Sequence, residues 1–596
     1  MTDAAFTTRP EIRGRFGVVA STHWIGTAVG MGALERGGNA FDAAVATGFT
    51  LQIVEPHLNG PGGEVPILFH RAGDDAPTVI CGQGVVPRAA SIAAFRERGL
   101  SMVPGTGLLP AVVPGAFDAW MLLLRDHGTM TLREVLEPAI GYATGGFPLV
   151  PRAAASIHAA ATHFRERWPS SAAVWLPHGE APLGNRTIRT PSIGATYRRL
   201  LDEAEAVGGD RVAQIEAARR AFHEGFVADA IDRHCRQAFE DGGGRRDAGL
   251  LTGDDMARWR ASVEPSVSID YHGHRIHKTG PWGQGPVMLQ ALALLRDVDL
   301  GAMDPNGADF VHAVTEALKL AFADRDVFYG DPDVVDVPLD TLLSDAHART
   351  RRAQIGDIAS DALRPSELPE ADTRLAALLG LAGSETPVGL GAGEPTFVDV
   401  PEVEGDTVHL DVADRFGNVV SATPSGGWLQ SSPAIPELGF NLNTRAQMCW
   451  LDERLPSSLA PGKRPRTTLT PTLVTRDGEP RLALGTPGGD QQDQWSLLLL
   501  LRQLHHGGNL QANVDAPMFH TTRLVASFYP RGIGGELLIE ERVGRATLDA
   551  LRERGHTLAV QDGWSLGRLC AVARGTGGAL RAAATPRFMQ AYAAGR

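Results

Sequence analysis

The residues best suited to chemistry in this sequence are Asp406 and Thr407, which are adjacent. A threonine hydroxyl is a poor nucleophile at neutral pH and needs a base beside it. A threonine at a new amino terminus carries that base in its own amine, whose ordinary pKa is about 7.7–8.0. Breaking the bond between Asp406 and Thr407 would give one residue that supplies both nucleophile and base. The unbroken chain would then be an inactive precursor.

The segment that must position Thr407 has the pattern of a β-hairpin. β-Favouring residues over 408–413 lead to a turn signal at 416–418, and a second such run follows over 419–423. Hairpins are common, so this pattern alone favours a threonine that merely opens a strand. The catalytic interpretation depends on segments elsewhere in the chain.

Segments at both ends of the chain, together with 405–427, give this sequence its resemblance to the gamma-glutamyltransferase family of N-terminal-nucleophile hydrolases. The other matching segments are 17–21, 32–46, 54–57 with 60–63, 459–472 and 485–490. They occur in the family's order, and with a last strand expected near 567–572 the resemblance covers nearly the whole chain. It implies a fold of the α+β class, a four-layer αββα sandwich, and cleavage of the precursor immediately before Thr407.

The resemblance also implies two subunits cut from one autoprocessed precursor, a large one of residues 1–406 and a small catalytic one of residues 407–596. Residues from about 360 to 406 are rich in Pro, Gly, Glu and Ala, which predicts a flexible tether before the cleavage site. Apolar residues recur at helical spacing over 41–52, 116–125, 132–143, 309–323 and 494–504. Strands are predicted over 408–413, 419–423, 473–476 and 481–485.

The resemblance extends to the catalytic groups. Counting from Thr407, the family's second catalytic hydroxyl corresponds to Ser425, whose implied role is to orient the Thr407 hydroxyl and amine. The family's glycine pair, whose backbone N–H groups hold the tetrahedral oxyanion, corresponds to Gly488 and Gly489. Glycine lets the backbone approach a substrate closely, and each such donor is worth about 3–4 kcal/mol. The alternative for the pair is a plain turn.

The residues that would hold a γ-glutamyl group depart from the family pattern. The family's two carboxylate-binding serines correspond to Thr467 and Thr468, which keep the hydroxyl donors. Its arginine for the α-carboxylate corresponds to Gln83, and its two acidic ligands of the α-ammonium correspond to Asn443 and Ala446. Removing one partner of a desolvated charge pair typically costs about 2–5 kcal/mol, so a zwitterionic γ-glutamyl group is predicted to bind poorly.

Arg445 and Arg466 bring new cations close to the same positions. They would suit a carboxylate without a neighbouring amine, as in oxamate or in the glutaryl-type side chain taken by cephalosporin acylases of this family. Exposure on the surface is the alternative for both. The predicted function is hydrolysis of an amide through an ester on Thr407, with a carboxylate-bearing acyl group that lacks an α-amine. Two alternatives stay open: a true gamma-glutamyltransferase or glutathione hydrolase, and a non-catalytic structural relative.

The composition limits the partners. The chain has 596 residues, 43% hydrophobic and 21% charged, which is ordinary for a globular protein with a large core. Its net charge of −13 and its lack of a long Lys/Arg cluster argue against nucleic acid or an anionic membrane as the main partner. A small-molecule amide is the expected partner, besides the association of the two subunits. The resemblance is also compatible with a dimer of two heterodimers, each made of one large and one small subunit.

No apolar run near the amino terminus has the length of a signal-peptide core, and no later segment approaches the ~20 apolar residues of a membrane span. A cytoplasmic location is therefore expected, although many family members are exported or membrane-anchored. The four cysteines form no close pair and are expected to be small buried hydrophobes. Neither a cofactor nor a metal is expected.

Three motifs suggest other chemistry, and each is set aside on its context. The glycines of 389–393 follow no strand and precede no helix, which argues against a dinucleotide loop. Residues 563–567 fit the G-x-S-x-G nucleophile motif, but no histidine follows Ser565, which is instead expected in a terminal core strand. His505 and His506 lack a carboxylate at ligand spacing and are expected to be a polar pair at a helix end.

Overall fold

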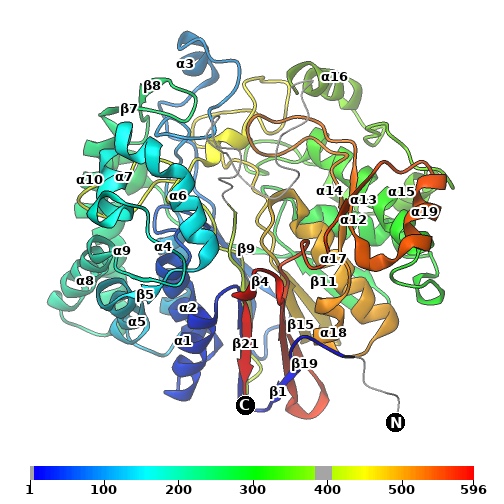
Figure 1. Cartoon of the computed structure of the whole chain (residues 1–596), viewed down its shortest axis with the longest axis horizontal. Helices are drawn as coiled ribbons and strands as arrows, with labels where there is room; N and C mark the ends of the chain where they lie inside the picture. Colours follow the sequence, from blue (N-terminus) through cyan, green and yellow to red (C-terminus); the bar gives the residue numbers. More distant parts are fainter. Residues whose placement is uncertain (1–5, 383–405) are drawn as a thin grey trace.

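The polypeptide forms two seven-stranded antiparallel sheets at the centre of the molecule (Figure 1). The computed structural model describes residues 6–382 and 406–596. The order of the first sheet is β21 (Tyr592–Gly595), β2 (Gly17–Ser21), β12 (Leu410–Asp414), β13 (Val419–Ala422), β3 (Val65–His70), β4 (Thr78–Gly82) and β9 (Ser262–Pro265). The order of the second is β1 (Ile12–Gly14), β20 (Leu580–Ala584), β19 (Cys570–Arg574), β15 (Glu479–Gly485), β14 (Thr472–Arg476), β11 (His274–Lys278) and β10 (Val267–Tyr271).

The two sheets pack against each other through apolar side chains. Val18 and Leu68 of the first sheet share one buried cluster with Leu473 and Val572 of the second. Since side chains alternate between the two faces of a strand, the remaining apolar residues of each strand point away from this cluster. Each sheet must therefore be covered on its outer face as well.

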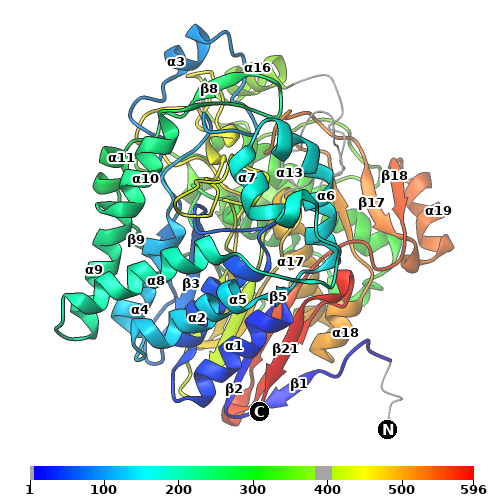
Figure 2. The same ribbon diagram turned by 60° about the vertical axis from the view of Figure 1, so that its left-hand side comes forward.

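A layer of helices provides that cover on either side (Figures 1 and 2). Against the first sheet lie α1 (Trp24–Glu35), α2 (Ala40–Val54) and α4 (Ala116–His127), and α5 (Leu132–Gly145) packs on α2. Against the second lie α12 (Gly285–Leu295) and α17 (Gln492–Leu501), and α13 (Ala308–Phe328) packs on α12. The layers follow the order helix, sheet, sheet, helix, which confirms the predicted αββα sandwich of the α+β class.

The remaining elements surround this frame. On the side of the first sheet and above it are α3 (Ile92–Glu97), α6 (Pro151–Glu166), α7 (Pro169–Trp175), α8 (Pro191–Ala206), α9 (Arg211–His223), α10 (Phe226–Cys235) and α11 (Gly253–Arg258), with the short strands β5 (Phe147–Pro148), β6 (Thr187–Ile188), β7 (Ala238–Glu240) and β8 (Arg246–Ala248). On the other side are α14 (Leu339–Leu342), α15 (Asp345–Arg352), α16 (Ala371–Leu381), α18 (Leu510–Asp515) and α19 (Arg545–Glu553), with β16 (Phe519–Thr521), β17 (Leu537–Glu540) and β18 (Leu558–Gln561).

The five predicted helices and four predicted strands are confirmed, with ends that differ by a few residues. Local signals account for the helix starts: Asn39 and Asp42 form a capping box at the start of α2. The helix predicted over 494–504 consists of α17 followed by a π-helical turn at Arg502–His506. His505 and His506 lie at that end, as predicted, and His505 is hydrogen-bonded to the Tyr271 hydroxyl at 2.8 Å.

Three expectations need correction. The strand near 567–572 is not the last, because β20 and β21 follow β19. Ser565 is exposed in the turn before β19, and its hydroxyl donates to the Asp562 carbonyl at 2.6 Å, so it belongs to no core strand. The predicted tether contains the helix α16, and its part over 383–405, including the glycines of 389–393, lies outside the described residues.

The four cysteines are buried, as predicted. Over residues 6–382 and 406–596, no helix combines the length and apolar character that a membrane span requires. In the same part of the chain no group of histidine, cysteine and acidic side chains has an arrangement that could hold a metal ion.

Candidate active site

A hairpin in the middle of the first sheet positions Thr407. Strand β12 pairs with β13 from Leu410 opposite Ala422 to Ala413 opposite Val419, which confirms the predicted hairpin. Beyond the strand ends the two arms stay together, because Thr407 forms an antiparallel bridge with Ser425. Ser425 in turn exchanges two backbone hydrogen bonds with Glu64, at 2.9 and 3.0 Å. The backbone of Ser425 is thus held between those of Thr407 and Glu64.

A chain of buried hydrogen bonds links the Thr407 hydroxyl to the carbonyl that precedes it. Thr407 Oγ1 donates to Ser425 Oγ at 3.3 Å, and Ser425 Oγ donates to the Asp406 carbonyl oxygen at 3.0 Å. Gln492, the first residue of α17, donates from Nε2 to Thr407 Oγ1 at 3.4 Å. The candidate nucleophile, its supporting hydroxyl and the carbonyl of the Asp406–Thr407 bond therefore lie in one small buried cluster.

Arg445 fixes the direction of the Ser425 hydroxyl. One guanidinium nitrogen donates to Ser425 Oγ at 3.0 Å, and Nε donates to Glu64 Oε1 at 2.6 Å. Burial raises the pKa of the Glu64 carboxyl, and the neighbouring Arg445 charge opposes that rise. The rings of Trp428 and Phe528 flank the guanidinium at 5.4 and 5.9 Å. Because Ser425 Oγ already accepts from Arg445 and Thr407, its own proton is directed to the Asp406 carbonyl.

Gly488, the first residue of the glycine pair, holds the side chain of Asp406. The N–H of Gly488 donates to Asp406 Oδ1 at 2.8 Å, and the second carboxylate oxygen forms an ion pair with Arg568. Gly488 has a φ of 127° and Gly489 a φ of 56°, values in the region that favours glycine. The pair forms the tight turn between β15 and α17, and that turn directs the Gly488 N–H toward the cleavage junction.

Among the described residues, none of the γ-glutamyl-binding positions that depart from the family pattern forms a hydrogen bond with Thr407. Asn443 uses its amide on the backbone: Nδ2 donates to the carbonyls of Gly62 and Val112 at 2.8 and 3.1 Å, and Oδ1 accepts the Arg445 N–H at 3.2 Å. Ala446 is buried in an apolar cluster. Gln83 is buried, and its Nε2 donates to the Gly84 carbonyl at 3.2 Å. Asn443 therefore positions the Arg445 turn.

Arg466 lies in a second cluster behind the glycine turn. It donates to Ser527 Oγ at 3.1 Å, and Ser527 donates to Asp490 at 2.6 Å. Burial, reinforced by the neighbouring Arg325 charge, lowers the pKa of Arg466 to about 10. Both Arg445 and Arg466 are buried, so the alternative of surface exposure is wrong for each.

The two threonines that follow Arg466 are also buried. Thr467 Oγ1 accepts the N–H of Leu469 at 3.3 Å, and the Thr467 N–H donates to the Trp282 carbonyl at 2.9 Å. The Thr468 hydroxyl forms no hydrogen bond within residues 6–382 and 406–596. Thr467 Oγ1 only accepts in its contact with Leu469, so the O–H donor of either threonine has capacity for a ligand.

Sequence reasoning missed Glu64, Gln492 and Arg568, all of which contact the cluster. Glu64 directly follows the matching segment 60–63, and Gln492 follows 485–490 by two residues. Their proximity to Thr407 depends on long-range packing rather than on a local pattern, so only their position next to these segments gave a signal.

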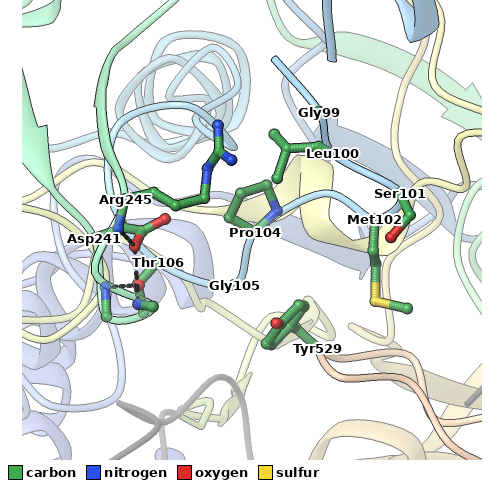
Figure 3. Close-up of a pocket in the computed structure, with 12 residues that line it drawn as sticks. Gly99, Leu100, Ser101, Met102, Pro104, Gly105, Thr106, Asp241, Arg245 and Tyr529 are labelled. Atoms are coloured by element: carbon green, nitrogen blue, oxygen red, sulfur yellow. Dashed lines mark hydrogen bonds between the residues drawn. The ribbon is translucent and has the colours of Figure 1, made fainter. Parts of the chain in front are cut away.

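A cavity of about 190 Å³ lies between loops from 99–106 and 241–245 and the ring of Tyr529 (Figure 3). The loop that carries Tyr529 connects the cavity to the glycine turn, because the preceding Phe528 packs on Gly489. The Tyr529 N–H donates to Gln447 Oε1 at 3.2 Å and so ties this loop to the turn of Arg445.

The chain is similar to known proteins over nearly its whole length. The model of the gamma-glutamyltranspeptidase family matches residues 26–595. The chain is 31% identical to the acylase ACY 1 proenzyme of Pseudomonas sp. (strain SE83), over 91% of this chain and 87% of that one. It is 28% identical to the oxamate amidohydrolase proenzyme of Klebsiella pneumoniae, over 96% and 97%.

Two solved structures share the whole fold. The structure of LmbA2991HD has a TM-score of 0.91 and 49% identity, and the match covers 99% of this chain and 100% of that chain. The crystal structure of cephalosporin acylase from Bacillus halodurans has a TM-score of 0.80 and 27% identity, and the match covers 100% of this chain and 99% of that chain.

Proposed function

Since this chain belongs to the gamma-glutamyltranspeptidase family of amide hydrolases and acylases, we propose that it cleaves itself between Asp406 and Thr407 and then hydrolyses an amide through an ester on Thr407. The observation that carries this proposal is the buried chain of hydrogen bonds from the Thr407 hydroxyl through Ser425 to the Asp406 carbonyl.

Self-cleavage begins when Thr407 Oγ1 attacks the carbonyl carbon of Asp406. Ser425 donates to the carbonyl oxygen and stabilises the negative charge that develops there. The bond from carbon to the Thr407 nitrogen then breaks, the hydroxyl proton is transferred to that nitrogen, and Asp406 is left as an ester on Thr407. Water hydrolyses the ester, which yields the Asp406 carboxylate and a free Thr407 amine.

The mature enzyme repeats this chemistry on a substrate. The Thr407 amine accepts the hydroxyl proton as the oxygen attacks the substrate amide, and that proton leaves with the departing amine. The N–H groups of Gly488 and Gly489 are the proposed oxyanion donors, and each is worth about 3–4 kcal/mol. The departure of Asp406 releases the Gly488 N–H for this purpose, because Asp406 Oδ1 accepts it in the precursor.

The proposed substrate has a carboxylate in its acyl group and no α-amine. Three features support this choice: Ala446 is buried in an apolar cluster, the Asn443 amide is occupied by backbone groups, and Gln83 carries no charge. A γ-glutamyl group would then lack its usual counter-charges at these positions, at a cost of about 2–5 kcal/mol for each lost pair.

Glutathione hydrolysis is the second candidate, and one observation favours it. Glu64 Oε2 is buried and accepts no hydrogen bond from the described residues, while Oε1 is taken by Arg445. A carboxylate oxygen so close to Ser425 could receive an ammonium group. Glu64 would in that case replace the two acidic ligands that this chain lacks.

Competition kinetics separate the two candidates. Matured protein, checked by intact mass for fragments that meet at Asp406 and Thr407, is given glutathione together with oxamate and with a glutaryl-amide, and kcat/KM is measured for each. We expect the amine-free acyl groups to exceed glutathione by about a thousandfold, which corresponds to roughly 4 kcal/mol. A clear preference for glutathione that disappears in Glu64→Gln would instead establish the second candidate.

A further inference from the structure

The side chain of Gln492 contacts the candidate nucleophile directly. This residue begins α17 and is buried, and its Nε2 lies 3.4 Å from Thr407 Oγ1. An amide nitrogen can only donate, so Thr407 Oγ1 accepts this hydrogen bond, while its own proton is directed to Ser425 Oγ. Gln492 thus places an N–H donor on the oxygen that attacks the carbonyl carbon in the proposed reaction.

The backbone of Thr470 fixes which end of the Gln492 amide faces Thr407. The Thr470 N–H donates to Gln492 Oε1 at 3.2 Å, and because an N–H cannot accept, the atom that faces it is the amide oxygen. Nε2 is thereby directed to Thr407. A buried ion pair holds Thr470 in turn. Lys278 Nζ donates to the Thr470 carbonyl at 3.0 Å, and the Thr470 hydroxyl donates to Asp493 at 3.1 Å.

A donor on Thr407 Oγ1 matters most when that oxygen carries negative charge. At 3.4 Å the contact is long and contributes little to the neutral hydroxyl, but catalytic hydrogen bonds of this kind tighten in the transition state. A hydrogen bond to an ionised oxygen is also roughly twice as strong as a neutral one. The donor therefore favours a step in which Oγ1 leaves a carbon atom over the states in which Oγ1 is bonded to carbon.

The two halves of the proposed reaction differ in the charge that Oγ1 takes. When the amide bond breaks, the nitrogen leaves and Oγ1 stays bonded to the carbonyl carbon. When the ester is hydrolysed, water adds to that carbon, the C–Oγ1 bond breaks and its electron pair stays on Oγ1. One proton of the water passes to the Thr407 amine and from there to Oγ1, which restores the hydroxyl and leaves a carboxylic acid that ionises. A donor on Oγ1 therefore assists ester hydrolysis, whereas in amide cleavage it favours return to the amide.

We propose that Gln492 is a further catalytic residue of this site and that its N–H stabilises Thr407 Oγ1 while the ester is hydrolysed. The inference rests on the proposed function. The role applies twice, first to the Asp406 ester during self-cleavage and later to the acyl ester of each turnover. Among the described residues, the hydrogen bonds of Gln492 go to Thr407 and Thr470 and not to Asp406, so the donor stays in place when Asp406 leaves.

Self-cleavage tests this role with a substrate that is part of the chain. Gln492→Met keeps the length of the side chain and removes its N–H donor. The rate constant of ester hydrolysis should fall by about 10²-fold and that of ester formation should change by less than about threefold, so full-length chain with an ester at Asp406 accumulates. Hydroxylamine cleaves this ester to a hydroxamate and leaves an amide intact. Intact mass with and without hydroxylamine therefore measures the ester fraction.

Gln494→Met is the matched control. Gln494 is a buried glutamine of the same helix, and its amide exchanges hydrogen bonds with the backbone of Thr521 at 2.9 and 3.0 Å. This variant should mature without hydroxylamine-sensitive chain, even where its stability is lower. Gln492→Asn keeps an amide but withdraws it by one methylene, so it should accumulate less ester than Gln492→Met, and it replaces that variant if Gln492→Met does not fold.

The role of Gln492 is overturned if both of its variants mature as fast as the wild type, or if they mature slowly without any hydroxylamine-sensitive chain. An equal ester fraction in Gln494→Met also overturns it. Wild type that is never cut before Thr407 would instead refute self-cleavage itself, which separates failure of the proposed function from failure of this inference.

Discussion

Replacing Ser425 with alanine should slow self-cleavage, and the structure gives the size of the effect. The hydroxyl lies 3.0 Å from the ground-state Asp406 carbonyl oxygen, and it is thus already a hydrogen-bond donor to the atom on which the negative charge develops. Losing one such preorganised donor costs about 2.7–4 kcal/mol, or about 10²–10³ in rate. The contact with Thr407 is longer, at 3.3 Å, and adds little to this figure.

The assay follows the loss of full-length chain by intact mass after purification at low temperature, which gives a first-order rate constant. Ser425→Thr returns the hydroxyl and should cleave within about tenfold of the wild-type rate. Ser421→Ala is a second control from the same hairpin, because the Ser421 hydroxyl is buried in β13 and forms no hydrogen bond with the described residues. Turnover by matured Ser425→Ala should also fall, by about 10–10³.

The reasoning fails if Ser425→Ala, folded by circular dichroism, matures as fast as the wild type. The carbonyl of Asp406 would then be polarised by another group, and the correspondence of Ser425 with the family's second hydroxyl would be wrong. A slow Ser425→Thr with an equally slow Ser421→Ala would point to general disturbance of the hairpin instead.

The other predictions concern the nucleophile, the glycine turn and a buried acid. Thr407→Ala should remain one full-length chain by mass and hydrolyse no amide; fragments that still meet at residue 407 would contradict the mechanism. Gly488→Ala should mature poorly and lose most activity, because its φ of 127° disfavours a side chain and the new Cβ would meet the Trp495 ring; unchanged maturation and turnover would exclude the oxyanion role. Glu55 has a folded pKa of about 7, above its value in the unfolded chain, so the folded state binds more protons between about pH 4.5 and 7. Wild-type stability relative to Glu55→Gln should therefore fall by up to about 3 kcal/mol as pH rises through that window, as measured by urea unfolding; a difference independent of pH would contradict it.

Local sequence patterns predicted many of the helices and strands, because capping, apolar periodicity and turn formation depend on residues close together in the sequence. Helix α2 has its capping residues and its apolar run within one segment, and the hairpin of Thr407 has its turn signal between two β-favouring runs. The tether over 360–406 was a weaker prediction. It was based on the composition of the whole segment, and this did not reveal the alanine- and leucine-rich stretch within it that forms α16. Ser565 was also misplaced, because excluding the nucleophile motif says nothing about the turn in which this residue lies.

The contacts of the candidate site could not be predicted in the same way. Arg445 pairs with Glu64 across 381 residues of sequence, and Arg568 pairs with Asp406 only because β19 and the cleavage junction meet in the sandwich. A charged residue that is almost fully buried, as Arg445 and Arg466 are, gives no sign of its burial in the sequence. The division of the precursor into chains 1–406 and 407–596 stays a prediction, which the mass measurements test.

The place of β12 in the first sheet has a consequence for how accurately a new chain end can act. Free termini usually fray, and a nucleophile on a frayed end would sample many orientations. Strand β12, which begins three residues after Thr407, is instead hydrogen-bonded to β2 on one edge and to β13 on the other. Cutting the chain at Thr407 would therefore free an amine without freeing the strand that carries it. The amine would be a free chain end, while the strand that carries it would stay hydrogen-bonded on both edges within the sheet.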